Sequence, residues 1–152
     1  MKIRLKVQKE IIDAAKHDYA GVNFEEYDDK VLILLHGAVG IYLDKKDVII
    51  NFEKLEDRKV DMFELDPETI TAGKVFAEKT KDLKEMEFGV IAVRIAAPEN
   101  NRYINVKYLK YFEDIKTFMM GGQYEPVLVI NNDNKVAGFI LPIEIKKEEQ
   151  IK

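Results

Sequence analysis

The chain has 152 residues, of which 47% are hydrophobic, and a formal net charge of −4. This length favours one domain, or at most two small ones, and the hydrophobic share is sufficient to build a core. The acidic balance argues against a surface that is basic throughout, as nucleic-acid binders often have, but it leaves room for a local basic stripe.

The chemistry of an enzyme is poorly represented in this chain. It contains no cysteine and no serine, which removes disulfides, zinc knuckles and the two commonest nucleophiles. The carboxylates of residues 25–29 lack the ligand order of a calcium loop, and no glycine-rich phosphate loop is present. We therefore expect no catalytic residues, no metal site and no cofactor.

No apolar run approaches the roughly 20 residues that a membrane span needs. The first residues alternate apolar and basic side chains, which is typical of a strand and not of a signal peptide. The sequence thus predicts a cytoplasmic protein without a membrane partner.

The first third of the chain reads as strands around one short helix. The predicted helix covers residues 8–16, with Lys9, Asp13 and Lys16 on its polar face. Predicted strands are residues 2–7, 22–24, 31–35, 39–43 and 48–52, separated by turns at 27–30, 36–37 and 44–47.

The middle of the chain predicts a charged connector, a strand at 60–65 and a second helix. Asp66 is a suitable N-cap, Pro67 suits the first helical position, and the helix is expected to reach about Lys84. Residues 88–97 and 102–104 then read as strands.

The last third has the clearest pattern. From Asn105, a plausible N-cap, apolar and aromatic side chains recur at helical spacing as far as Met119, and Gly121-Gly122 is expected to end this helix. Residues 127–130 and 136–141 read as a hairpin around an Asn-rich turn, followed by a charged tail. A weak internal repeat lays residues 39–42 on residues 136–139.

Three stretches carry a resemblance to a known family: Asn105-Val106-Lys107-Tyr108-Leu109, Glu125-Pro126-Val127-Leu128-Val129 and Leu141-Pro142-Ile143. They resemble the last helix, the penultimate strand and the C-terminal end of bacterial DNA polymerase III sliding clamps. The resemblance implies an α+β, DNA-clamp-like single domain, residues 1–152, whose antiparallel sheet is backed by helices. Two βαβββ-type units, about 1–53 and 88–146, would be joined by a helical connector, about 54–87. Because clamps string several such domains together, the chain resembles a single-domain relative of phage or mobile-element origin.

The resemblance also implies two binding surfaces. Lys9, Lys16, Lys107 and Lys110 would face the backbone of duplex DNA without sequence preference. Leu141, Pro142 and Ile143 would form an apolar groove for short linear peptides of the kind that polymerases carry. Clamp subunits close rings, so a homo-oligomer is expected.

Simpler interpretations stand beside these. Lysines on the polar face of a helix are usually just solvated, a proline near a strand end simply stops pairing, and the aromatic face of the Asn105 helix suits a core. The leading hypothesis is a non-enzymatic, clamp-like replication accessory protein. The first alternative is a phage or mobile-element structural or assembly protein that oligomerises through sheet edges, and the second is a small regulatory domain that binds a ligand between helices and sheet.

Overall fold

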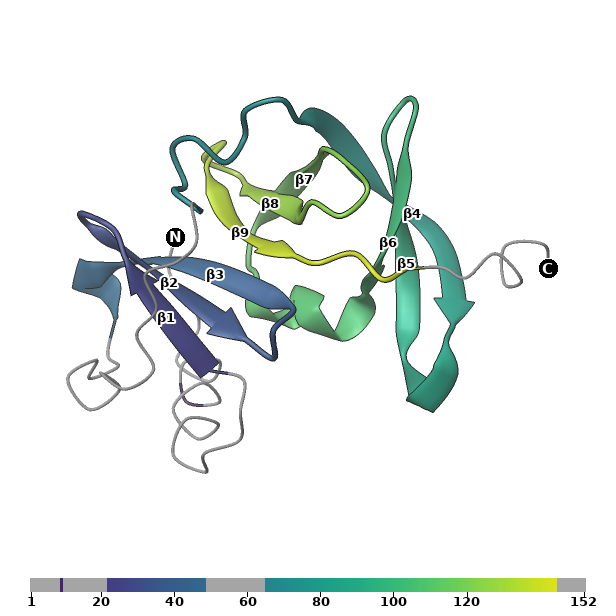
Figure 1. Ribbon diagram of the computed structural model, residues 1–152, viewed down its shortest axis with the longest axis horizontal. Helices are drawn as coiled ribbons and strands as arrows, with labels where there is room; N and C mark the ends of the chain where they lie inside the picture. The colour runs from purple at the N-terminus through teal and green to yellow at the C-terminus, as the bar shows by residue number, and fades with distance from the viewer. Residues whose placement is uncertain (1–8, 10–21, 49–64, 145–152) are drawn as a thin grey trace.

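The computed structural model describes residue 9, residues 22–48 and residues 65–144. Nine strands in these residues form one antiparallel sheet in the order β1-β2-β3-β9-β8-β7-β4-β5-β6 (Figure 1). The strands are β1 (Val22–Glu26), β2 (Lys30–Leu35), β3 (Val39–Asp44), β4 (Val75–Glu85), β5 (Ile91–Ala96), β6 (Asn101–Asn105), β7 (Ile115–Met120), β8 (Val127–Asn131) and β9 (Val136–Ile140). The same segments contain the 3-10 helices η1 (Lys45–Asp47), η3 (Glu87–Gly89) and η4 (Val106–Tyr111).

The prediction of an α+β, DNA-clamp-like fold is wrong. In segments 22–48 and 65–144 the longest helical element is η4, with six residues, so no helices back the sheet there. The antiparallel sheet itself was predicted correctly, as were the approximate positions of β1–β3, β5, β6 and the β8–β9 hairpin. The predicted helix at 8–16 and the strands at 2–7 and 60–65 lie almost entirely outside the described residues.

The segment after Asn105 is a short 3-10 helix followed by a strand, and not one long helix. Asn105 caps η4 as predicted, because its side-chain oxygen accepts a hydrogen bond from the backbone N–H of Lys107 at 3.1 Å. Phe112, with φ −117° and ψ 133°, is already extended, and Asp114, with a φ of 54°, then turns the chain into β7. Gly121-Gly122 consequently follows a strand. The spacing of apolar residues from 105 to 119 resembles that of one long amphipathic helix. It arises because two short elements, η4 and β7, follow one another and each buries some of its residues.

The predicted helix from Asp66 to Lys84 is also wrong, although its first turn was read correctly. The Asp66 carboxylate accepts a hydrogen bond from the backbone N–H of Glu68 at 2.8 Å. Gly73, with a φ of 75°, ends this turn, and β4 begins at Val75. The described part of the supposed helical connector is therefore a turn and a strand. β4 is a strand because it pairs with β5 and β7. Most of its residues are exposed and many are charged, so its own sequence does not show the alternation that predicts a strand.

The central strands are buried on both faces, so the sheet separates two apolar clusters. In β8, Val127 and Val129 belong to the larger cluster, whereas Leu128 and Ile130 belong to the smaller one. This alternation follows from the period of two along a strand. Ile70, in the turn that Asp66 begins, packs into the smaller cluster and covers that face of the sheet.

A polar contact ties the same covering segment to the sheet. The hydroxyl of Tyr42 donates to the carbonyl oxygen of Leu65 at 2.5 Å, and the backbone N–H of Leu65 donates to the hydroxyl of Tyr27 at 3.2 Å. Tyr27 in turn donates to the buried carboxylate of Glu25 at 3.1 Å. The pKa of Tyr27 is raised to about 12 by burial and by this hydrogen bond, and burial also raises the pKa of Tyr42.

The long strand β4 bends the sheet back on itself. Its first residues, Val75–Ala77, pair with β7, and its later residues pair with β5, with an irregularity in register between Lys79 and Leu83. The sheet curls until β6 meets the chain that continues from β9, where Ile143 donates its N–H to the carbonyl oxygen of Tyr103 at 2.7 Å. This contact builds the region described next.

Candidate functional site

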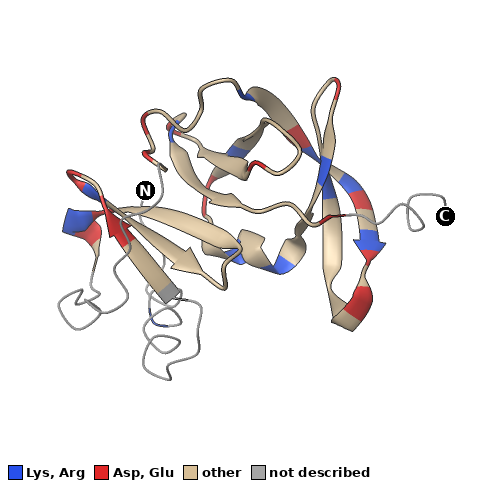
Figure 2. Ribbon diagram, in the orientation of Figure 1, with Lys and Arg blue, Asp and Glu red and all other residues tan. Residues whose placement is uncertain are grey.

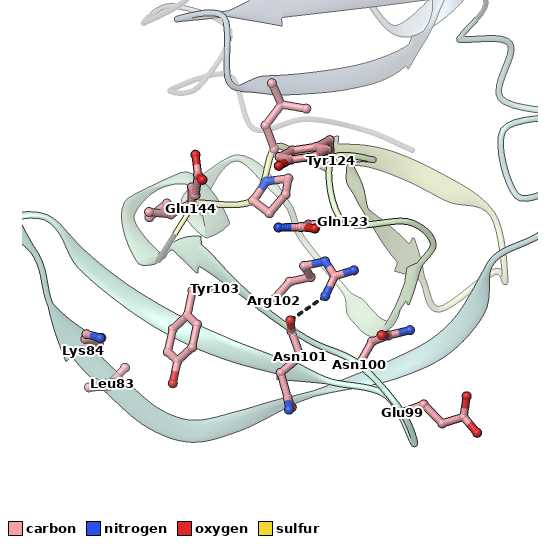
Figure 3. Close-up of a pocket in the computed structure, with 13 residues that line it drawn as sticks. Leu83, Lys84, Glu99, Asn100, Asn101, Arg102, Tyr103, Gln123, Tyr124 and Glu144 are labelled. Atoms are coloured by element: carbon pink, nitrogen blue, oxygen red, sulfur yellow. Dashed lines mark hydrogen bonds between the residues drawn. The ribbon is translucent and has the colours of Figure 1, made fainter. Parts of the chain in front are cut away.

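A cleft of about 1100 Å³ lies where the chain after β9 crosses the edge of β6. Its walls come from the end of β4, the β5–β6 turn with the start of β6, the β7–β8 loop and residues 141–144 (Figure 3). Apolar, amide and charged side chains all line it, and two tyrosines, Tyr103 and Tyr124, come from different walls. Such a mixture suits a ligand with both apolar and polar groups.

Arg102 is the central cation of this cleft. Its Nη1 donates to the carbonyl oxygen of Asn101 at 2.8 Å, marked in Figure 3, and its Nη2 reaches the carbonyl oxygen of Gly121 at 3.5 Å. The guanidinium thus connects β6 to the β7–β8 loop. Its Nε is buried and has no hydrogen-bond partner within the described part of the chain. This buried Nε is not accessible to a ligand, but Nη1 and Nη2 each carry a second N–H beyond the bonds to Asn101 and Gly121, which gives Arg102 donor capacity for a ligand oxygen.

The β7–β8 loop is braced from within. The carboxylate of Glu125 accepts a hydrogen bond from the N–H of Gly122, and the backbone N–H of Glu125 donates to the carbonyl oxygen of Gly122 at 3.1 Å. A Cβ on Gly121 would collide with this carboxylate, so a larger residue there would have to displace the Glu125 side chain from its bond to Gly122. The brace holds Tyr124, which is 76% exposed, at the cleft.

The predicted groove residues Leu141, Pro142 and Ile143 lie together and are the shared wall of two concavities. They line the large cleft on one side and a smaller pocket of about 360 Å³ on the other. Leu141 is 39% exposed, whereas Pro142 and Ile143 are partly buried. The prediction that this segment binds a peptide stays a prediction, but the segment has the concave surroundings that such binding needs.

Three of the four predicted DNA-contacting lysines lie in the described residues. Lys107 and Lys110 are exposed on η4, and their ammonium groups lie 5.4 Å and 5.2 Å from the ring centroids of Tyr108 and Tyr111. Lys9 is exposed, and Lys16 lies outside the described residues. Lys107 and Lys110 lie on a six-residue 3-10 helix and not on the long helix that was predicted to carry them. Contact with DNA stays a prediction.

Sequence reasoning missed Arg102, Tyr103 and Tyr124 as cleft residues. Arg102 and Tyr103 were read as part of a short extended segment, and Tyr124 follows the Gly-Gly break. The one available signal was a tyrosine two positions after Gly121-Gly122, within a loop otherwise made of glycine, proline and polar residues. The meeting of these residues depends on the curl of the sheet, which no local pattern encodes.

Figure 2 shows that charged residues of both signs follow one another along the β4–β5 hairpin and that other charges stand at the turns. Across residues 22–48 and 65–144, no group of three or more His, Asp or Glu side chains could hold a metal ion. No helix in the part of the chain that the structure describes is long and apolar enough to cross a membrane.

Comparisons with known proteins add no family. No protein-family model matches the chain, and searches of curated proteins and of solved structures found no match.

Proposed function

We propose that the chain is a non-enzymatic binding protein that takes a short linear segment of a partner protein in the cleft beside β6. The observation that carries this proposal is the position of Leu141, Pro142 and Ile143 in one wall of a 1100 Å³ cleft whose other parts supply Arg102 and Tyr124. Apolar side chains of a peptide would pack on residues 141–143, and polar groups of the peptide would face Arg102 and Tyr124.

The chemistry of the cleft favours a segment that combines an apolar side chain with a carboxylate. The terminal nitrogens of Arg102 each carry a second N–H beyond their bonds to Asn101 and Gly121, and a guanidinium forms strong, directional hydrogen bonds with carboxylates. The amide side chains of Asn100, Asn101 and Gln123 can pair with peptide backbone groups. The exposed Tyr124 offers a large contact area at little entropic cost.

The non-enzymatic part of the proposal rests on the side chains available. The chain has neither serine nor cysteine, and Tyr27, Tyr42 and Asp44, whose pKa values are shifted, line neither of the two cavities. Perturbed groups that gather in a cleft are the usual sign of catalysis, and these three lie elsewhere.

A pair of fluorescent peptides tests the proposal. Both have the same two apolar residues, and one has an aspartate beside them where the other has an asparagine. We expect anisotropy titration to show tighter binding of the aspartate peptide, and Arg102→Gln to weaken this peptide about tenfold, equal to about 1.4 kcal/mol, with a smaller effect on the other. Lys79→Gln, on the exposed face of β4 outside the cleft, is the matched control.

Two results would overturn the proposal. One is binding of both peptides that Arg102→Gln and Tyr124→Ala leave unchanged. The other is an absence of binding together with unchanged amide shifts at Arg102, Tyr103 and Ile143 at millimolar peptide.

The assembly alternative keeps one specific observation in its favour. β1 is the first strand of the described sheet and pairs only with β2 within the described residues. An edge strand of this kind is a template for pairing with another chain. Large, concentration-dependent assemblies without peptide binding would favour this alternative.

A further inference from the structure

The smaller pocket, on the other side of the Leu141–Ile143 wall, has the size of a site for one side chain. It measures about 360 Å³, near the lower end of the roughly 300–1,000 Å³ that ligand pockets have. Met86 and Val90 of the β4–β5 hairpin and Tyr108 of η4 supply further apolar lining. The pocket thus suits a single long side chain with an apolar stem.

Backbone hydrogen bonds hold two walls of this pocket in place. The N–H of Met86 donates to the carbonyl oxygen of Val90 at 2.7 Å and closes the tip of the hairpin. In the other wall, the N–H of Leu141 donates to the carbonyl oxygen of Ala38 at 2.8 Å. Because both walls are formed before a ligand arrives, binding there costs little ordering of the backbone.

Carboxylates are the only charged groups of the described chain that line the pocket. They belong to Glu87, at the hairpin tip, and Glu144, and both residues are exposed. Neither carboxylate makes a hydrogen bond or an ion pair within residues 22–48 and 65–144. The large cleft, in contrast, has charges of both signs. Apolar walls with two carboxylates at the rim are complementary to a cation on an apolar stem.

Arginine fits this combination better than lysine. Its guanidinium has five N–H donors in a planar fork and can serve two carboxylates, whereas the lysine ammonium is a more strongly hydrated point charge. Its methylene stem can lie along Met86 and Val90 while its charge stays at the rim. The ammonium of Lys107, 5.4 Å from the ring centroid of Tyr108, does not line the pocket, and its exposure lets solvent and salt screen it.

The cleft and the smaller pocket share the Leu141–Ile143 wall and Glu144, so one extended peptide can reach both. We propose that the segment bound in the cleft also places an arginine side chain in the smaller pocket, with its guanidinium at Glu87 and Glu144. This inference rests on the proposed function and specifies the partner segment: an apolar pair between an acidic residue and an arginine. Such a segment crosses the wall with its carboxylate toward Arg102 and its guanidinium toward the pocket.

A pair of fluorescent peptides tests the inference, because citrulline has the shape of arginine without its charge. The aspartate peptide of the proposed function is extended beyond its apolar pair by arginine or by citrulline, and both chain directions are synthesised. At about 50 mM salt, we expect the arginine peptide to bind about tenfold more tightly than the citrulline peptide in one direction. This gain should shrink as salt is added, because the rim charges are exposed.

Charge-removing variants locate the arginine. Glu87→Gln combined with Glu144→Gln should reduce the ratio of the two affinities to about one. Both positions are exposed, so glutamine is expected to leave the fold intact. The matched control is Glu85→Gln, at an exposed position of β4 that lines neither cavity, and it should keep the tenfold gain.

Acetyl-arginine amide, which has no aspartate, examines the smaller pocket without the cleft. At millimolar concentration it should shift the methyl resonances of Met86 and Val90 more than acetyl-citrulline amide does. The variant with Glu87→Gln and Glu144→Gln should remove this difference.

The outcomes separate this inference from the proposed function. Binding of the citrulline peptide that depends on Arg102, with no gain from arginine in either direction, overturns the inference and leaves the proposed function in place. A gain that the double variant retains also overturns it, because the arginine then lies elsewhere. If no peptide binds but acetyl-arginine amide shifts Met86 and Val90, the proposed function fails, and with it the claim that one segment occupies both cavities.

Discussion

Gly138 is the position at which a single methyl group should disrupt this fold most. A Cβ atom there would lie 2.1 Å from the carbonyl oxygen of Gly40 and 2.5 Å from Cε1 of Phe112. Real Cβ contacts essentially never fall below 3.0 Å, so β3 and β9 would have to move apart. The β3–β9 pairing is the one that joins β1–β3 to the other six strands of the described sheet, so Gly138→Ala should weaken the whole fold.

The expected cost follows from two terms. Overpacking a well-packed site costs about 1–3 kcal/mol, and each backbone hydrogen bond disturbed in the ladder adds about 1 kcal/mol. We expect a loss of about 3 kcal/mol, a large fraction of the roughly 5–15 kcal/mol that stabilises a typical domain. At Gly122 the nearest atom to an added Cβ is 3.4 Å away, an ordinary contact, so Gly122→Ala is the matched control and should lose less than about 0.5 kcal/mol.

Urea unfolding followed by far-ultraviolet circular dichroism measures both variants, since the chain has no tryptophan to report by fluorescence. A Gly138→Ala midpoint equal to that of Gly122→Ala would refute the reasoning. Adding Phe112→Ala to Gly138→Ala removes the ring but leaves the carbonyl oxygen of Gly40 in place. Full rescue by this second change would show that the ring, and not the strand pairing, sets the limit.

Three further predictions concern pH and charge. Burial raises the pKa of Tyr27 to about 12, so its neutral form stabilises the fold fully below pH 10, and this stability is lost as the pH rises through about 12. Absorbance at 295 nm should show late ionisation of both Tyr27 and Tyr42, and Tyr27→Phe should remove only the part of it that is centred near pH 12. The hydrogen bond from Lys30, at 2.5 Å, lowers the pKa of Asp44. Asp44→Asn should therefore reduce the free energy of unfolding by less than about 1 kcal/mol at neutral pH. In urea titrations, the difference in stability between this variant and the wild type should vanish as the pH falls well below 3.8. If η4 contacts DNA, Lys107→Glu with Lys110→Glu should abolish duplex binding at about 50 mM salt, and a wild-type chain that shows no binding there ends that hypothesis.

Local chemistry was predictable where it acts within a few residues. The caps at Asp66 and Asn105, the His36-Gly37 turn and the alternation in the β8–β9 hairpin could all be read from neighbouring side chains. Each of these depends on contacts between residues that are close in sequence, which is where propensity and pattern are informative.

The two false helices failed for a common physical reason. β4 is a largely exposed strand whose pairing partners are distant in the sequence. The second false helix covers two short consecutive elements, η4 and β7, each of which has buried residues. Both produce helix-like spacing without a helix. Only the register with β5, β7 and β8 distinguishes them, and this register is a property of the assembled sheet.

The cleft and the smaller pocket both lie where the chain changes its pairing partner, next to Pro142. Leu141 still donates its N–H to the carbonyl oxygen of Ala38, at 2.8 Å, as a continuation of the β3 side. The next N–H on that side of the chain belongs to Ile143, and after Pro142, which has no N–H at all, it donates to Tyr103 of β6 and not to β3. The sequence prediction treated this proline either as a simple strand end or as part of a peptide groove. The strand end is confirmed, since β9 ends at Ile140, whereas peptide binding stays a prediction. A chain that leaves one strand and pairs with another forms a ridge here, with a concavity on each flank.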